Sequence, residues 1–289
     1  MYIKFWGTRG SIPVPGNDTL KYGGNTSCVE IGLSNNKMLI LDAGSGIREL
    51  GKKLVNNGKG STIDILFTHY HWDHIQGIPF FLPIFQKEAT INFYGETSNG
   101  EKTKDILGSQ MSSNYFPICL DAMNAELIYH DVKPFKNYEI NGAKLETFRA
   151  NHSSPTISYK ITDGKKNIVY LTDNELIMED SSQNNIYDKL KKSNKELIDF
   201  CFGCDYLIHD SMYDESTLID KKGWGHSANV TLAYFGILSQ VKNLILFHYN
   251  PDYTDAKIDG MLKETNDVLK NENSNVKCVA AMEGLRIDC

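Results

Sequence analysis

The sequence predicts an α/β (α+β) protein in which β-sheets are covered by outer helices. Short runs rich in branched and aromatic apolar residues, typical of strands, recur along most of the chain. Helical periodicity is concentrated in residues 46–55 and in the last hundred residues. No repeat, low-complexity tract or linker interrupts the 289 residues, so we expect a single domain over 1–289 with a substantial core.

The predicted elements follow these patterns in chain order. Strands are predicted at residues 3–6, 28–31, 38–41, 63–68, 91–94, 144–148, 157–161, 168–172, 206–209, 244–248 and 276–281. Apolar positions three and four residues apart predict helices at residues 46–55, 186–198, 230–241 and 258–269. For residues 98–123 two interpretations stay open, a lid over a site and a helical excursion with a small apolar face.

Composition and charge exclude several classes of protein. Thirty Lys and Arg residues against 36 Asp and Glu give a net charge of −6, the opposite of what a broad basic face for duplex nucleic acid requires. No apolar run approaches the roughly 20 residues that span a bilayer. Residues 1–6 lack the basic start and apolar stretch of a signal peptide, so we expect no membrane association.

The six cysteines are scattered, and only Cys201 and Cys204 have CxxC spacing. A zinc site would need a second pair, and a redox motif would need a suitable βαβ context. We interpret the two as partly buried thiols at a helix end. Scattered cysteines without a signal peptide predict a reducing, cytoplasmic location.

The most informative segment is residues 68–74, directly after an apolar strand. It contains His69, His71, Asp73 and His74. A cluster of imidazole and carboxylate groups rarely packs in a protein core, because such groups are usually exposed unless they are paired or bound to a metal. They suit zinc, and also iron or manganese. The segment therefore predicts a metal site at the end of a strand, for one ion or, with further ligands, for two.

The pattern His-x-His-x-Asp-His after a strand resembles the metal-binding motif of the metallo-β-lactamase superfamily. Other motifs of that family recur in order, namely Asp-Ala-Gly at 42–44, Asn-His at 151–152, Thr-Asp at 172–173 and Phe-His at 247–248. The resemblance spans nearly the whole chain. It implies an αββα sandwich, in which two facing mixed β-sheets have helices outside.

The resemblance also implies two divalent metal ions, zinc in the first place and manganese or iron as alternatives. One ion would be held by His69, His71 and His152, the other by Asp73, His74 and His248, with Asp173 as a bridge. Ions bound in this way would make hydroxide available near neutral pH. Asp42 would orient a ligand imidazole through a hydrogen bond.

The superfamily hydrolyses β-lactams, thioesters, lactones and phosphodiesters, so the fold alone does not select a reaction. Asp173 stands where β-lactamases carry a different residue, and only one helix and one strand are predicted after His248, too little for the substrate domain of a glyoxalase II. Residues 207–212 and 223–228 resemble paired motifs of the phosphodiesterase branch, in which an acidic residue orients a histidine that protonates the leaving oxygen. In this sequence the resemblance assigns these two roles to Asp210 and His226. Asp210 is an aspartate where the family motif has the longer glutamate.

The phosphodiesterase branch includes tRNase Z and class II-like cyclic nucleotide phosphodiesterases. Residues 5–13 and 23–28 resemble its glycine-rich opening, where Arg9 is either a phosphate contact or an exposed loop residue. In the usual bacterial tRNase Z, a basic arm that clamps tRNA lies between the third and fourth motifs. Residues 153–172 leave no room for such an arm, because two predicted strands fill them.

We therefore expect a dinuclear metal-dependent phosphodiesterase acting on a small phosphodiester, best matched by a 3′,5′-cyclic nucleotide, with Asp73, Asp210 and His226 as catalytic residues. The alternatives are a tRNA 3′-processing endoribonuclease, a thioester or lactone metallohydrolase, and a non-catalytic metal-binding protein. The expected partners are the small substrate and, as the family resemblance implies, a second copy of the chain in a homodimer. No extended nucleic-acid surface is expected.

Overall fold

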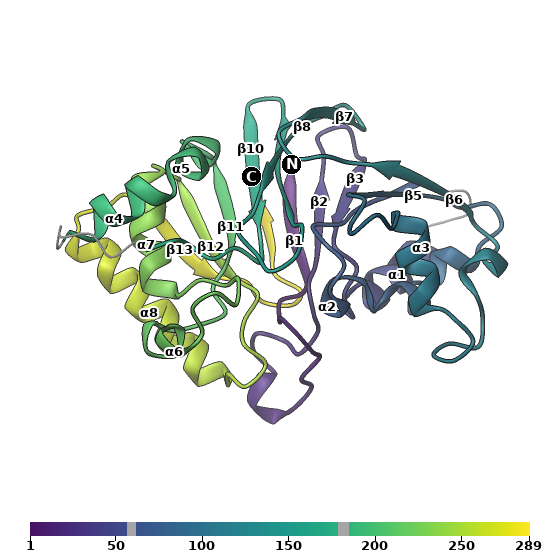
Figure 1. Ribbon diagram of the computed structural model, residues 1–289, viewed down its shortest axis with the longest axis horizontal. Helices are drawn as coiled ribbons and strands as arrows, with labels where there is room; N and C mark the ends of the chain where they lie inside the picture. Colours follow the sequence, from purple (N-terminus) through teal and green to yellow (C-terminus); the bar gives the residue numbers. More distant parts are fainter. Residues whose placement is uncertain (57–61, 179–184) are drawn as a thin grey trace. The chain divides into compact units, whose positions relative to one another are not determined.

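The computed structural model describes residues 1–56, 62–178 and 185–289. The chain divides into two units. Unit 1 comprises Met1–Gly16, Gly23–Lys133 and Met282–Asp288, and unit 2 comprises Asn17–Tyr22, Pro134–Ala281 and Cys289. Each unit contains one seven-stranded mixed β-sheet together with helices (Figure 1), which confirms the predicted α/β class.

The sheet of unit 1 has the strand order β14-β1-β2-β3-β4-β5-β6. Its strands are β1 Tyr2–Gly7, β2 Cys28–Gly32, β3 Met38–Leu41, β4 Thr62–Leu66, β5 Thr90–Gly95, β6 Glu126–Asp131 and β14 Arg286–Asp288. The pairs from β3 to β6 are parallel, and those joining β14, β1, β2 and β3 are antiparallel. The strands β6 and β14 escaped prediction, because β6 is largely polar and partly exposed and β14 has three residues.

The helices of unit 1 bury apolar faces against this sheet. They are α1 Ile47–Asn56, α2 Trp72–Ile75 and α3 Thr103–Gln110, with 3₁₀ turns η2 Ile78–Phe80, η3 Leu82–Phe85 and η4 Leu120–Ala122. Ile47 and Leu50 of α1 and Leu107 of α3 belong to one core cluster with Ile65 and Ile91 of the sheet. Of the two interpretations of residues 98–123, the structure therefore supports the helical excursion with an apolar face.

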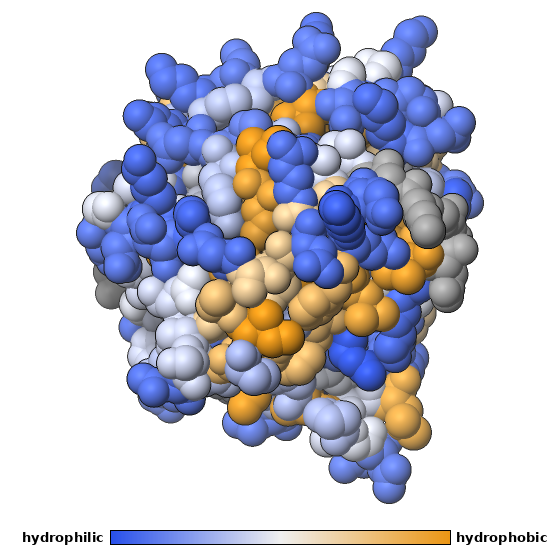
Figure 2. Space-filling model, turned by 90° about the vertical axis from the view of Figure 1, so that its right-hand side faces the viewer, coloured by the Kyte–Doolittle hydropathy of each residue, from blue (hydrophilic) through white to orange (hydrophobic). Residues whose placement is uncertain are grey.

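The surface of unit 1 also carries large apolar side chains. Figure 2 shows a face on which apolar side chains gather in a band between hydrophilic ones. Phe80, Tyr115 and Ile118 are exposed, and Phe80 packs edge-on against Phe116 with ring centroids 5.6 Å apart. Among the helices that the structure describes, none combines the length and the apolar character needed to cross a membrane.

The sheet of unit 2 has the order β13-β12-β11-β10-β9-β8-β7. Its strands are β7 Asn137–Ile140, β8 Ala143–Arg149, β9 Ile157–Asp163, β10 Lys166–Leu171, β11 Tyr206–Asp210, β12 Asn243–Phe247 and β13 Lys277–Ala280. The pairs from β10 to β13 are parallel, whereas those from β7 to β10 are antiparallel. Only β7 was not predicted among these strands. The parallel half of the sheet determines where the functional side chains of unit 2 lie.

The described helices of unit 2 include one of 17 residues, α8. They are α4 Ile186–Ser193, α5 Lys195–Cys201, α6 Glu215–Asp220, α7 Asn229–Leu238 and α8 Asp255–Asn271, with the 3₁₀ turn η1 Asn17–Thr19. The helix α7 lies against β12 and α8, and α8 lies against β13 (Figure 1).

Two details of unit 2 refine the sequence predictions. The helix predicted at 186–198 is two helices, because the Asn194 side chain bonds the Leu190 carbonyl and both backbone groups of Ile177 at the break. Cys201 ends α5 as expected, but Cys201 and Cys204 are fully rather than partly buried. Burial raises the pKa of the Cys204 thiol to about 12, so these thiols are inert packing groups.

Candidate active site

In unit 2, the predicted site residues meet at one edge of the sheet. The parallel strands β10, β11 and β12 end beside Asp173, at Asp210 and beside His248. Strand β8 is antiparallel to β9, which is antiparallel to β10, so β8 runs in the same direction as β10 and leads to His152. Parallel strands place their carboxyl ends together, as at the ligand sites of α/β sheets. Residues far apart in the sequence thus become neighbours.

Several of these residues have an unusual backbone. Asp173 and His248 in unit 2 and Asp42 in unit 1 have φ angles of 51°, 59° and 57°. This left-handed region is uncommon for residues other than glycine and costs free energy that the surrounding structure must offset. Asp42 and His248 directly follow the last residues of β3 and β12, and Asp173 lies two residues after the end of β10. Such observed outliers favour a functional role.

The carboxylate of Asp173 lies between two histidines of unit 2. Its Oδ1 is 3.7 Å from His152 Nε2, and its Oδ2 is 3.3 Å from His248 Nε2. His152 Nδ1 donates to the Gly225 carbonyl at 3.0 Å, because a carbonyl can only accept. With the proton fixed on Nδ1, the Nε2 atom of a neutral ring presents its lone pair on the Asp173 side.

Asp210 and His226 form the pair that the motif resemblance predicts. His226 Nδ1 donates to Asp210 Oδ2 at 2.6 Å, so the shorter Asp side chain still reaches the ring. The other Asp210 oxygen accepts the backbone amides of Ser227 at 3.0 Å and Met212 at 3.1 Å. Asp210 is fully buried, whereas the side chain of His226 keeps 11% of its surface exposed. His226 is thus the accessible member of the pair.

Each member of this pair stabilises the charged form of the other. Burial alone would raise the pKa of Asp210, but His226 and His248 hold it well below its usual range. Burial would likewise lower the pKa of His226, and the carboxylates of Asp210 and Asp173 raise it instead. An ionised Asp210 beside a protonated His226 is the arrangement of a positioned general acid.

In unit 1, four predicted residues lie in one short segment, which comprises the loop after β4 and the helix α2. His69, Asp73 and His74 are buried, and His71 is exposed. The His69 ring lies 4.5 Å from the His71 ring and 4.3 Å from the His74 ring, measured between centroids. His74 Nε2 is 3.2 Å from Asp73 Oδ2, which also accepts the Ser11 amide at 2.8 Å. Nitrogen and oxygen donors therefore converge in this segment.

Asp42 organises these imidazoles from the neighbouring strand end. Its Oδ2 accepts from His74 Nδ1 at 2.9 Å, and its Oδ1 accepts the Thr68 amide at 2.8 Å. The Thr68 hydroxyl donates to Asp42 and lies 3.1 Å from His69 Nδ1. Thr68 therefore links the Asp42 carboxylate to a second imidazole, that of His69. Gly44 allows this packing, because a Cβ there would lie 2.2 Å from the Asp73 carbonyl oxygen.

The donor atoms of each unit fit a divalent metal ion. In both units, histidines have Nδ1 anchored by an oxygen acceptor while Nε2 lies within 4 Å of a carboxylate. Anchoring one ring nitrogen fixes the tautomer and the orientation in which the other can bind metal. Mixed imidazole and carboxylate donors suit zinc, iron and manganese alike.

The structure contradicts one of the two interpretations of Arg9, that of an exposed loop residue. Arg9 is fully buried, and its Nε donates to the Gly23 carbonyl at 2.9 Å. The guanidinium therefore holds two loops of unit 1 together instead of lying exposed on a loop. The glycine-rich sequence around Arg9 suggested an open loop, which hid this packing role.

Sequence reasoning missed several polar residues of the site. Asn174 is buried, accepts the Asn151 amide at 2.9 Å through Oδ1 and lies 3.3 Å from His209 Nε2. His209 Nδ1 donates to the Asp210 carbonyl at 2.7 Å, and burial lowers the pKa of His209, so this histidine is a neutral structural group. Glu175 bonds the loop before His226. The signal in the sequence was adjacency, of Asn174 and Glu175 to Asp173 and of His209 to Asp210.

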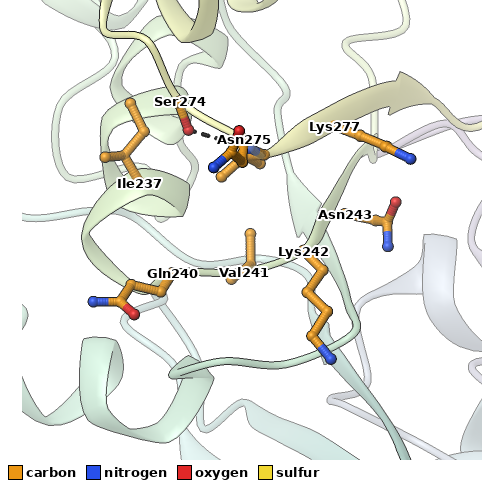
Figure 3. A pocket seen from close by; sticks show the side chains of 9 residues that line it. Ile237, Gln240, Val241, Lys242, Asn243, Ser274, Asn275 and Lys277 are labelled. Carbon is orange, nitrogen blue, oxygen red and sulfur yellow. Dashed lines mark hydrogen bonds between the residues drawn. The ribbon is translucent and has the colours of Figure 1, made fainter.

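A separate cavity of unit 2, of about 530 Å³, lies at the opposite strand ends. Figure 3 shows Lys242 and Asn243 at the start of β12 with Gln240, Ser274 and Lys277 around the cavity. Its nine lining residues include no histidine, cysteine or carboxylate. His248 follows the other end of β12, so this cavity is not where the metal-ligand chemistry gathers.

The geometry and the family comparison define the same class of protein. The family model described as "Beta-lactamase superfamily domain" matches residues 37–249, so the chain belongs to that superfamily and is a metal-dependent hydrolase. This match confirms the resemblance to the metallo-β-lactamase superfamily, and relatives named ribonuclease Z bear out the resemblance to its phosphodiesterase branch.

Individual relatives agree with this class. Ribonuclease Z of Picrophilus torridus is 24% identical over 93% of this chain and 91% of its own length. The metallo-beta-lactamase fold protein YhfI from Bacillus subtilis has a TM-score of 0.70 at 16% identity, covering 99% of this chain and 98% of that one. Unliganded yeast PDE1 has a TM-score of 0.67 at 15% identity, covering 100% and 99%. The two structural likenesses show the fold.

Proposed function

We propose that this chain is a phosphodiesterase that hydrolyses a small phosphodiester, with a 3′,5′-cyclic nucleotide as the preferred substrate. The observation that carries the proposal is the Asp210–His226 pair, joined at 2.6 Å. Cleaving an alkyl phosphodiester releases an alkoxide, a poor leaving group that needs a proton. A histidine with a raised pKa, held by a buried carboxylate, supplies that proton.

The proposed metal ligands come from both units and follow the motifs of the superfamily. They are His69, His71, Asp73 and His74 of unit 1 with His152, Asp173 and His248 of unit 2. Two divalent ions held by this set, with zinc as the first candidate, would neutralise phosphoryl charge and lower the pKa of water. We infer that both units act as one hydrolase domain, because the family ligand set needs both.

The roles of the chain's own residues follow from their hydrogen bonds. His226 keeps its Nδ1 proton in the bond to Asp210, so the proton that moves to the leaving oxygen is the one on Nε2. Asp210 stays ionised throughout, because two backbone amides and His226 stabilise its charge. Asp42 and the Gly225 carbonyl keep the imidazoles of His74 and His152 in one orientation.

Two observations favour a small substrate. Residues 153–172, where the usual bacterial tRNase Z has its arm, form β9 and β10 with a short turn. The net charge of −6 also opposes extended phosphate binding. The alternative, tRNA 3′ processing, is supported by the relatives named ribonuclease Z. A thioester releases a thiolate, which leaves readily without a proton and so does not need His226. A lactone also releases an alkoxide, and the substrate panel distinguishes it from a phosphodiester.

A substrate panel with a salt series tests the proposal. Metal-loaded protein is assayed with 3′,5′-cyclic nucleotides, bis-p-nitrophenyl phosphate, precursor tRNA, a lactone and a thioester. We expect cyclic nucleotide hydrolysis whose kcat/KM falls only mildly with salt, because few phosphates are contacted. A tRNA enzyme would lose affinity by orders of magnitude between about 50 and 200 mM salt. Efficient tRNA cleavage with that steep slope would contradict the small-substrate proposal.

Location and assembly complete the proposal. None of the six cysteines forms a disulfide. Cys28, Cys201 and Cys204 are buried, Cys278 and Cys289 are partly buried, and Cys119 is exposed. Free thiols of this kind suit a reducing compartment, so we place the protein in the cytoplasm. We also propose a homodimer, which sedimentation equilibrium of the metal-loaded protein would test.

A further inference from the structure

We propose that Glu175 is a positioning residue, which sets the orientation of His152 and the loop before His226 by holding the turn at Gly223–Gly225. The inference rests on the proposed function for its link to catalysis. The hydrogen bonds that carry it all lie within unit 2 and are independent of the substrate.

The Glu175 carboxylate accepts several backbone donors of this turn. Its Oε2 accepts the Gly225 amide at 2.9 Å, and both carboxylate oxygens lie 2.9 Å from the Gly223 amide. Hydrogen bonds to an ionised acceptor are about twice as strong as neutral ones. One side chain therefore fastens two amides of a glycine-rich turn that lies outside any helix or strand.

The backbone of Glu175 fastens a second loop. Its amide donates to the Asn151 carbonyl at 2.9 Å, and Asn151 Nδ2 donates to the Glu175 carbonyl at 2.9 Å. Asn151 directly precedes His152, and Glu175 follows Asp173 by two residues. Glu175 thus joins the loops that carry His152, Asp173 and His226.

The turn itself transmits this restraint to His152. Gly225 has a φ of 83°, and a Cβ there would lie 2.1 Å from His152 Nδ1. Glycine is therefore required for the carbonyl to approach the ring and accept from Nδ1 at 3.0 Å. That bond keeps the proton on Nδ1 and the lone pair on Nε2. If Glu175 did not hold the turn, both the carbonyl and the following His226 would lose a fixed position.

The experiment compares Glu175→Ala, Glu175→Gln and the control Glu196→Ala. Glutamine keeps one oxygen acceptor for the Gly225 amide, so it distinguishes positioning from charge and serves if the alanine variant does not fold. Glu196 is an exposed acidic residue of α5 in the same unit. The readouts are zinc affinity by chelator competition, the His152 tautomer from long-range ¹⁵N correlation spectra of the metal-free protein, and kcat on a diester.

We expect Glu175→Ala to bind zinc about 10- to 100-fold more weakly and to lose kcat by a similar factor. Its His152 signal should change from the Nδ1-protonated tautomer to a mixture, while Glu175→Gln stays within about threefold of wild type and Glu196→Ala is unchanged. An unchanged tautomer and zinc affinity in Glu175→Ala would overturn the inference even if diester hydrolysis were found. Altered tautomer and affinity without any diesterase activity would refute the proposed function and leave the inference standing.

Discussion

The two units supply their functional residues in different ways. Unit 1 carries His69, His71, Asp73 and His74 in one short segment after a single strand, formed by a loop and the helix α2. Unit 2 gathers its residues from five loops or strand ends spread from 152 to 248. The first arrangement needs only one local segment, whereas the second depends on three parallel strands ending at the same edge. A local cluster can therefore be recognised from the sequence, whereas a dispersed cluster can be located only once the fold is known.

The two units also differ in chemistry. In unit 1, Asp42 and Thr68 only orient imidazoles. Unit 2 contains an orienting carbonyl at Gly225 and also the Asp210–His226 pair, in which a proton can be held and delivered. We infer that unit 1 serves metal binding and that unit 2 serves both metal binding and proton transfer.

The largest expected effect concerns metal content. If ligands of both units bind the ions, Asp73→Ala in unit 1 and Asp173→Ala in unit 2 should each lower the metal content well below two ions per chain. Both variants should lose most of their activity, because carboxylate ligands neutralise ion charge as well as bind it. Elemental analysis of protein purified without chelator measures this effect.

The matched control for that comparison is Asp199→Ala, which removes a carboxylate from the exposed face of α5. It should keep full metal content and activity. Full metal content and activity in Asp173→Ala would remove Asp173 as a bridging ligand. Metal loss in only one of the two ligand variants would assign metal binding to one unit alone.

A smaller and more selective effect separates orientation from proton transfer. Asp42→Asn keeps one acceptor but loses the other, so metal affinity should fall by about 10- to 100-fold. Asp210→Asn should instead lower kcat more than zinc affinity, because His226 loses its charged partner while a side-chain oxygen can remain near His248 Nδ1, which lies 3.4 Å from Asp210 Oδ2. Chelator competition and steady-state kinetics on the same preparations test this. A larger affinity loss in Asp210→Asn than in Asp42→Asn would reverse the division of roles.

The smallest effect concerns the stability of unit 2. Asp214 caps α6, accepting the Thr217 amide at 2.7 Å and the Ser216 hydroxyl at 2.8 Å and pairing with Lys257. Burial would raise the pKa of Asp214, but these donors hold it well below its usual range. Because the folded pKa is depressed, the stabilisation is present above the unfolded value of about 3.9 and is lost as the pH falls through the folded pKa.

Asp214→Ala should therefore lower the free energy of unfolding by about 1–2 kcal/mol at pH 7. Asp214→Asn keeps the capping oxygen and should lose less. Urea unfolding at a series of pH values measures both. The difference between Asp214→Ala and wild type should shrink below about pH 4, and a difference that grows toward acid would contradict the assigned charge state.

Much of the fold was predictable because apolar runs and helical periodicity report burial directly. The strands β2, β3 and β5 lie within a residue or two of their predicted bounds. By contrast, β6 and β7 are half-exposed and polar, so no apolar run marks them. The break at Asn194 was also hidden, because its cause is a tertiary contact to Ile177.

The site was predictable to the extent that its side chains are chemically distinctive. Histidine and aspartate motifs identified the candidates, and the short Asp210 side chain turned out to reach His226. The supporting contacts were not predictable, because a backbone carbonyl such as that of Gly225 leaves no mark in the sequence. Arg9 was misjudged for a related reason, since its partner is the Gly23 carbonyl.

The central claim, proton delivery by unit 2 to a phosphodiester leaving group, is tested most directly by His226→Ala on two substrates. On a 3′,5′-cyclic nucleotide, whose alkoxide leaves poorly, kcat should fall by roughly 10²–10⁴ at unchanged metal content. On bis-p-nitrophenyl phosphate the loss should be far smaller, because p-nitrophenolate leaves without a proton. Equal losses on both substrates, or strong thioester turnover without diesterase activity, would contradict the account.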